Sequence, residues 1–309
     1  MSKLIPLGEV YAQVERASRN CWDNQVPVKQ VRFEGLERVK IQGNTHPLRP
    51  AAQRAIAYRL GIPLNYLEKC DPGLQAINLN AWLEQERNEN LFFRFDGDSV
   101  RAIFTPRYIP IDNKQVVERL FECGFREDMP AQCSLDEEFM LLNLPDREKG
   151  FLIKRDDRLE PGIGIGNSEV GLSSLTLSAF VLRLVCTNGL IAKTALDSSY
   201  RHVSHRILDE FPAVLQQLST AWERQRGQWA LSAESYVENP EATLKTFNRQ
   251  FQLGKTEEEA VFWAWPREAG NTLLHIINTY TKAGHYPALP AESIYRLQRV
   301  GGNILAMLN

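Results

Sequence analysis

Long apolar stretches and cysteine motifs are both missing from this sequence. No run approaches the ~18 consecutive apolar residues of a membrane-spanning helix, so we predict that the chain does not cross a membrane. The first ten residues contain too short an apolar stretch for a signal peptide and include an acidic residue. The five cysteines are odd in number, widely spaced and without a Cys-x-x-Cys pair, a pattern typical of reduced thiols rather than of disulfides or a zinc site. We therefore predict a cytoplasmic protein.

An excess of charge and a nucleotide-binding loop are missing as well. The formal net charge of −2 gives no global attraction to nucleic acid or to anionic membranes, so any such binding requires a local patch. The sequence contains no Walker A loop. The glycines of Gly162–Gly166 alternate with isoleucine and do not follow the Gly-x-Gly-x-x-Gly spacing of dinucleotide-binding loops. Glycines inside a strand more often mark a bulge or a close backbone approach, and we predict no cofactor.

What is present is an ordinary globular composition with helical and strand patterns. The 309 residues, 43% of them hydrophobic, suffice for one large domain or two. Asp96-Gly97-Asp98 between two alternating apolar runs predicts a β-hairpin. Residues 175–185 fit a buried strand or a helix equally well. The spacing predicts helices over residues 1–26, 51–60, 73–89 and 113–123, and strands over residues 28–33, 38–41, 91–95, 100–104, 138–144, 150–154 and 162–167.

After residue 188 the pattern becomes helical to the end of the chain. We predict helices over residues 207–225, within 232–251, and over 271–282 and 291–308, with a break at Pro266. The fold class is therefore predicted to be α+β. An antiparallel sheet with packed helices occupies residues 1–190, and a helical C-terminal region occupies residues 191–309. The sequence shows no internal repeat and no low-complexity linker.

The most distinctive segments are Pro161–Gly171 and Arg183–Leu190, in which a glycine-punctuated strand and a long apolar run each lead into a small polar cluster. With Leu60–Tyr66, Asn78–Trp82 and Arg101–Asp112, they resemble the phage/plasmid-like protein family, a domain of unknown function found in prophages, conjugative plasmids and bacterial genomes. The resemblance runs through most of the chain and implies no established enzyme activity. The antirestriction and DNA-repair-like genes that accompany such genes on mobile elements imply a role in DNA metabolism.

A basic segment is the first candidate for a binding surface. Residues 38–67 contain five lysines and arginines and no acidic residue, with two tyrosines interleaved. A positive groove with aromatic faces holds single-stranded nucleic acid without reading its sequence. The alternative is a solvated basic surface whose long side chains cover apolar neighbours.

Two polar clusters are further candidates. His202 and His205 are three residues apart, which on a helix places both on one face. They would contact phosphate together with the neighbouring arginines, or bind a metal if a third ligand came from elsewhere; a basic helix start is the alternative. Cys186 would act as a nucleophile only with a histidine within hydrogen-bond reach, and its apolar neighbours favour a buried, inert thiol.

Acidic residues offer a third possibility. Asp156, Asp157 and Glu160 would hold Mg²⁺ in a nuclease if other elements supplied further carboxylates. Asp112 is more simply explained as a helix N-cap. We therefore predict neither a catalytic residue nor a bound metal.

Together these observations predict a single-stranded DNA-binding protein of mobile-element DNA metabolism. Analogy with single-strand annealing proteins extends this to annealing or recombination and to a homo-oligomer. A protein-interaction module that counters host defence is the alternative, and a metal-dependent nuclease is the third. The predicted nucleic-acid-binding residues are Arg38, Lys40, Arg49, Arg54, Arg59, Tyr58, Tyr66, Tyr108, Arg183, Arg201, His202 and Arg206.

Overall fold

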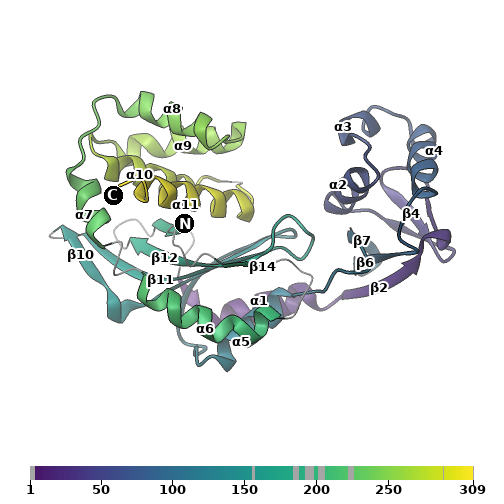
Figure 1. Ribbon diagram of the computed structural model, residues 1–309, viewed down its shortest axis with the longest axis horizontal. Helices are drawn as coiled ribbons and strands as arrows, with labels where there is room; N and C mark the ends of the chain where they lie inside the picture. The colour runs from purple at the N-terminus through teal and green to yellow at the C-terminus, as the bar shows by residue number, and fades with distance from the viewer. Residues whose placement is uncertain are drawn as a thin grey trace.

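The chain forms two lobes, each with its own hydrophobic core (Figure 1). The computed structural model describes residues 4–154, 157–183, 188–191, 198–200, 206–221, 226–287 and 289–308. The small lobe spans residues 21–104 and is inserted between two helices of the large lobe. The α+β class predicted from the sequence is confirmed.

The small lobe combines two three-stranded antiparallel sheets with three helices. Its strands run in the orders β2-β6-β7 and β3-β4-β5; the predicted hairpin at Asp96-Gly97-Asp98 is confirmed, and the predicted strands near residues 31–33 and 38–41 pair with each other. The helix predicted up to residue 26 ends at Ser18, because the next seven residues pair along their whole length with β6. The elements are β2 (Cys21–Pro27), the 3₁₀ turn Val28–Gln30, β3 (Val31–Phe33), β4 (Arg38–Ile41), β5 (Asn44–Pro47), α2 (Pro50–Arg59), α3 (Leu64–Leu67), α4 (Pro72–Leu83), β6 (Asn90–Asp96) and β7 (Ser99–Phe104).

The large lobe is built on an antiparallel sheet with helices on both faces. The strand order is β1-β8-β9-β11-β12-β13, with β10 paired to β11 and β14 paired to β12. Its strands are β1 (Ile5–Pro6), β8 (Pro130–Leu135), β9 (Met140–Pro145), β10 (Phe151–Lys154), β11 (Asp157–Asn167), β12 (Leu175–Arg183), β13 (Asn188–Ile191) and β14 (Ser198–Tyr200), with a 3₁₀ turn at Arg147–Lys149.

The helices of the large lobe divide between the two faces of this sheet (Figure 1). One face is covered by α1 (Leu7–Ser18), α5 (Asn113–Glu122) and α6 (Arg206–Ala221). The other is covered by α7 (Arg226–Glu234), α8 (Pro240–Gln250), α9 (Lys255–Glu268), α10 (Leu273–Ala283) and α11 (Ala291–Leu305). Within the described residues, no helix combines the length and the apolar composition needed to cross a bilayer.

At two glycines of β11, neighbouring parts of the protein approach the backbone closely, as the sequence predicts. A Cβ on Gly166 would lie 3.0 Å from Cζ of Phe139 and 3.2 Å from Cε2 of Tyr295 on α11, and a Cβ on Gly162 would lie 2.0 Å from the Leu144 carbonyl oxygen. Packing inside the protein therefore accounts for these two glycines.

Three predictions about the C-terminal half are corrected or resolved. Residues 175–183 are the strand β12. Residues 188–191 and 198–200 are strands and not helix, because they find pairing partners along β12. Pro266 does not break a helix: it lies in the last turn of α9, where few residues follow it. α10 and α11 pack against β13 and α11 also against β9, and the two-part division at residue 190 stays a prediction.

Candidate functional site

The arginines of the basic segment are largely neutralised by carboxylates. All of these acids lie outside the segment, from Glu34 just before it to Glu138, so the segment is much less positive in the folded protein than in the sequence. Only Lys40 among the five remains exposed without an ion pair within the described residues. The pairs are Arg38–Glu34 (3.8 Å), Arg49–Asp96 (2.6 Å), Arg49–Glu137 (3.6 Å), Arg54–Glu138 (2.6 Å) and Arg59–Glu86 (2.7 Å).

An aromatic groove lies between the lobes, where α2, α4 and the end of β7 meet the loop after β11. Its volume is ≈ 760 Å³. Two of its aromatic side chains come from different helices and are open to solvent: Tyr58 on α2 is 90% exposed and Trp82 on α4 is 49% exposed. Phe104 and Tyr108 also line it, and their rings are stacked with centroids 3.7 Å apart. Such surfaces bind flat, apolar rings by stacking.

The residues lining the aromatic groove include three from the predicted set, Tyr58, Arg59 and Tyr108. Trp82 and Phe104 were missed, because a sequence does not show which aromatic side chains stay uncovered after packing. Tyr66 is 44% exposed on α3, outside the lining of this groove. Arg87 also lines it, is exposed, and forms no ion pair with any described residue.

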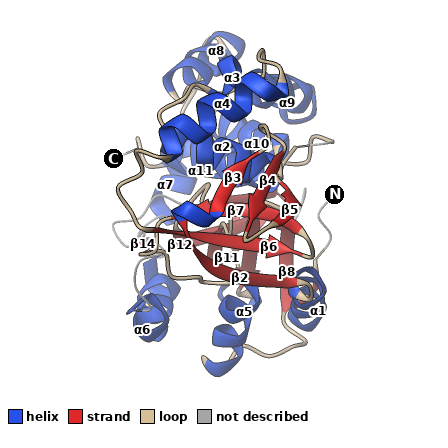
Figure 2. Cartoon of the chain, turned by 90° about the vertical axis from the view of Figure 1, so that its right-hand side faces the viewer, coloured by secondary structure: helices blue, strands red, loops and turns tan. Residues whose placement is uncertain are grey.

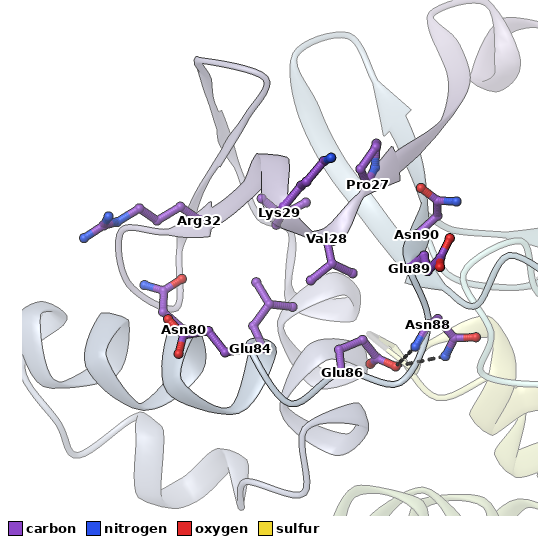
Figure 3. A pocket seen from close by; sticks show the side chains of 12 residues that line it. Pro27, Val28, Lys29, Arg32, Asn80, Glu84, Glu86, Asn88, Glu89 and Asn90 are labelled. Carbon is purple, nitrogen blue, oxygen red and sulfur yellow. Dashed lines mark hydrogen bonds between the residues drawn. The ribbon is translucent and has the colours of Figure 1, made fainter.

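A neighbouring cavity of ≈ 890 Å³ is lined by opposing charges (Figure 3). Lys29 and Arg32 line it together with Glu84, Glu86 and Glu89, so it offers no surface of one sign. Burial alone raises the pKa of Glu86, but hydrogen bonds from Asn88 and the ion pair with Arg59 outweigh it and lower the pKa. Glu86 therefore stays charged and fixes Arg59 at the edge of the aromatic groove.

The Asn167–Gly171 motif forms the loop between β11 and β12 that reaches the small lobe. Glu169 accepts a hydrogen bond from the backbone N–H of Asn113, 2.6 Å away, and pairs with Arg101 of β7. Asn167 donates to the Ile111 carbonyl at 3.0 Å. The motif therefore joins the first turn of α5 to the small lobe.

A second buried arginine completes this junction. Arg94 of β6 is 2% exposed. It donates to Asp23 at 2.9 Å, to Asp112 at 2.5 Å and to the Glu169 carbonyl at 3.2 Å. Burial lowers the pKa of Arg94, but Asp112 and Asp23 outweigh it and raise the pKa, so the guanidinium stays charged. The pKa of Tyr108, whose hydroxyl donates to the Glu169 carbonyl, is raised by burial.

The end of the motif shapes the aromatic groove. Val170 packs on Ala51 and Ala102 of the small lobe. Gly171 has φ +89°, and a Cβ there would lie 2.6 Å from Cε1 of Phe104. Both residues line the groove. The same five residues thus join the lobes and contribute one wall of the groove.

The Arg183–Leu190 motif lies elsewhere. β12 begins at Leu175, close to the Asn167–Gly171 loop, and ends at Arg183. Arg183 pairs with Leu159 and Asn188. Eight residues of strand separate the two ends by about 25 Å. Arg183 donates to Glu268 of α9 at 3.2 Å. The described residues of the two distinctive motifs therefore do not form one site.

Several predicted residues lie outside the described part of the chain. These are Arg201, His202, His205, Cys186 and Asp156, together with the side chains of Arg206 and Asp157. Asp112 is the N-cap of α5, in a capping box with Gln115, as the sequence predicts. Among the described residues, no three His, Cys, Asp or Glu side chains are grouped so that they could hold a metal ion. Cys21, Cys70, Cys123 and Cys133 are free thiols.

Comparison with known proteins gives one match. A family model described as a domain of unknown function, DUF932, matches residues 101–258, just over half of the chain. The matched part contains the Asn167–Gly171 loop, whereas most of the small lobe precedes it. No curated protein and no solved structure was found to match.

Proposed function

Because this chain belongs to the DUF932 family, whose function is unknown, we propose a function from its site: it binds single-stranded DNA by stacking bases in the aromatic groove. The observation that carries this proposal is the pair Tyr58 and Trp82, two exposed aromatic side chains from different helices that line one groove. Each base stacked on an aromatic side chain contributes about 1–3 kcal/mol, whatever the base. A duplex hides its base faces, so the groove selects single strands.

The charge distribution makes stacking the main source of affinity. The predicted arginines whose side chains the structure describes are engaged by carboxylates. Arg87, which lines the groove, and Arg107, one residue before Tyr108, are exposed. With few free cations, few counterions are released when DNA binds. We therefore expect log Kd to change with log salt with a slope of only about 1 to 2, in place of the steep dependence that the uninterrupted basic segment suggests.

The wider setting follows from the resemblance described above. We propose that the protein acts in the DNA metabolism of phages or plasmids, in a reducing cytoplasm, and as a homo-oligomer that supports annealing or recombination. The free thiols are consistent with that compartment.

A protein-interaction module remains the second candidate, favoured by one surface. Leu74 and Ile77, three residues apart, lie on one face of α4 and are 40% and 68% exposed; Trp82 is 49% exposed and is turned about 140° around the helix from Ile77. The twelve residues of α4 include no charged residue. Figure 2, viewed from the small-lobe side, shows α3 and α4 at the outer surface. A partner protein bound to this face would not require DNA.

Fluorescence anisotropy of a labelled ~40-nucleotide strand, between ~50 and ~300 mM salt, tests the proposal. We expect binding that a duplex of the same length does not compete away. Tyr58→Ala and Trp82→Ala should each weaken it by about tenfold or more. Tyr236→Ala is the matched control, because this tyrosine is 69% exposed but belongs to the large lobe.

Two results would contradict the proposal. One is an absence of binding at the lowest salt, which would direct attention to a protein partner on α4. The other is equal loss of affinity in Tyr236→Ala, since it would show that the groove has no special role.

A further inference from the structure

The outward face of α4 is apolar and carries no charge. Charged residues make up 24% of this chain, so about three are expected among the twelve residues of α4, but the helix contains none. Leu74 and Ile77 are 40% and 68% exposed, and Ala81 is exposed as well. Uncovered apolar side chains on an uncharged helix face are typical of a surface that contacts another protein.

Hydrogen bonds to β3 and to the turn after it fix which face of α4 points outward. The side-chain amide of Asn80 accepts from the Phe33 N–H and donates to the Phe33 carbonyl, both at 2.8 Å. The side chain of Gln75 accepts from the N–H of Leu36 at 2.8 Å. Because α4 cannot turn about its axis without breaking these bonds, little conformational freedom is lost when another surface docks on its outward face.

The exposed apolar residues have the spacing of paired helices. Leu74, Ile77 and Ala81 follow one another at intervals of three and four residues, as the contact positions of a coiled coil do. We call these three residues the α4 seam. Leu74 and Ala81 lie two turns apart, about 10.5 Å along the helix axis, with Ile77 between them. The seam therefore has a large residue at one end and a small one at the other.

We infer that the α4 seam is the interface of a two-fold symmetric dimer, in which α4 of one copy packs antiparallel on α4 of a second copy. A two-fold interface requires a surface that is complementary to itself. The antiparallel arrangement places Leu74 of each copy against Ala81 of the other and the two Ile77 side chains near the symmetry axis. Large residues thus meet small ones, and no like charges face each other.

The charges beyond the two ends of the seam suit the same arrangement. Lys69 lies just before α4, and Glu84 is the C-cap of the helix. Both are exposed, and neither forms an ion pair with a described residue. An antiparallel pair brings the N-terminal end of each helix to the C-terminal end of the other, so Lys69 of each copy approaches Glu84 of the other. This complementarity favours a second copy as the occupant of the face.

The inference rests on the proposed function, for which it names the contact between copies. Trp82 is turned about 140° around the helix from Ile77 and lines the aromatic groove, so DNA and the second copy use different sides of α4. One short helix gives a small interface, and we expect a dissociation constant on the order of 10–100 μM. Copies bound side by side on one strand have an effective concentration of about 1 mM, so the dimer makes strand binding cooperative.

Sedimentation equilibrium between ~5 and ~200 μM protein tests the inference. We expect the apparent mass to rise with concentration from 35.3 kDa towards twice that value. Leu74→Glu should weaken association at least tenfold, because it places a charge in the apolar contact. Leu231→Glu is the matched control, since this leucine is also helical and 40% exposed but belongs to α7 of the large lobe.

A mixture of two variants tests the antiparallel pairing. Ala81→Lys alone should also lose association. In an equimolar mixture of Leu74→Glu and Ala81→Lys, the introduced glutamate faces the introduced lysine, and the second Leu74–Ala81 contact is unaltered. We expect the mixture to associate at least threefold more tightly than either variant alone, with a gain that shrinks at ~300 mM salt. A mixture that associates no better than its components would overturn the inference.

Strand binding separates failure of the inference from failure of the proposed function. Leu74→Glu should bind a ~10-nucleotide strand, which has room for one copy, as tightly as the unmodified protein, but should bind a ~40-nucleotide strand without cooperativity. Trp82→Ala should lose strand binding and still dimerise. A dimer that Leu74→Glu disrupts, in a protein that binds no single strand, would support the seam and overturn the DNA proposal. Strand binding by a chain that stays monomeric at the highest concentration, or equal loss of association in Leu231→Glu, would overturn the inference alone.

Discussion

The two lobes differ in how many of their large apolar side chains are exposed to solvent. The small lobe holds about a quarter of the chain but six of the eleven large hydrophobic side chains that are exposed within the described residues. The large lobe covers both faces of its sheet with helices (Figure 1). A surface that stays apolar without a covering element is typical of an interaction site. The comparison therefore favours the small lobe as the part that carries the proposed binding surface.

The buried polar networks of the large lobe and of the junction between the lobes also have different roles. In the large lobe, buried Asn143 donates to Gln132 and to Gln298 of α11, both at 3.2 Å, which fixes the helix on the sheet. At the junction, buried Arg94 and Arg101 bind carboxylates from elsewhere in the chain. One network fixes packing within a lobe, and the other fixes one lobe to the other.

The largest expected effect comes from removing one partner of the junction network. Glu169→Ala leaves Arg101 buried without a carboxylate and removes the acceptor of the Asn113 N–H. We expect the free energy of unfolding to fall by about 3–5 kcal/mol, measured by denaturant titration. Glu137→Ala, which removes a carboxylate that is 73% exposed, should change it by less than about 1 kcal/mol. Similar losses in both variants would show that the buried Arg101–Glu169 pair contributes no more stability than the exposed Arg49–Glu137 pair.

Alanine substitutions at two glycines distinguish the cost of backbone strain from the cost of steric crowding. Gly171 and Gly43 have similar φ values of +89° and +94°, but a Cβ meets Phe104 at Gly171 and nothing within 4 Å at Gly43. Gly43→Ala should cost about 1 kcal/mol from strain alone. Gly171→Ala should cost about 1–3 kcal/mol more because it also crowds the groove. Equal costs in thermal unfolding would contradict the close packing of the motif on Phe104.

Acid should weaken the small lobe through Glu86. Its pKa is lowered in the folded protein, so its contribution to stability is fully present above the unfolded value of about 4.3. That contribution is lost as pH falls through the folded pKa. Glu86→Gln should therefore lower the unfolding free energy at pH 7 and make little difference near pH 3. A difference that does not shrink with pH would assign the effect to packing.

The smallest effect on stability is expected at the apolar face of α4. Ile77 is 68% exposed, so Ile77→Ser should change the unfolding free energy by less than about 0.5 kcal/mol. If this face binds a partner or a second copy, the same change should reduce the apparent mass in sedimentation or abolish partner binding. Unchanged association would leave the aromatic groove as the binding surface of the small lobe.

The sequence predicts the elements whose signals are local. Pro50 at the start of α2 and Asp96-Gly97 in the β6–β7 hairpin identify those elements correctly. β12 and β13 are different, because an apolar run becomes strand or helix according to its partners. Pairing of Val181 with Leu190 decides the matter, and no local signal shows it.

The candidate site is predictable only in part, for a related reason. Tyr58 and Tyr108 were in the predicted set and line one groove. The charge of Arg54 was expected to be free, but its partner Glu138 lies 84 residues further along the chain. Trp82 was placed on a helix without any sign that its ring would stay uncovered. Exposure and ion pairing are tertiary properties, and binding sites depend on both.

The insertion of the small lobe between α1 and α5 has a consequence for how this protein can be taken apart. The two helices are held together without it: Tyr11 donates to Glu118 at 3.0 Å, and Lys114 lies 3.6 Å from Glu15. The chain therefore leaves the large lobe and returns to it at neighbouring points. A short linker in place of residues 21–104 would therefore remove the small lobe as one continuous segment and leave the contacts between α1 and α5 in place. The same cut would leave Arg94 and Arg101 of the excised segment without Asp112 and Glu169, so the two lobes are continuous in sequence but not independent in charge.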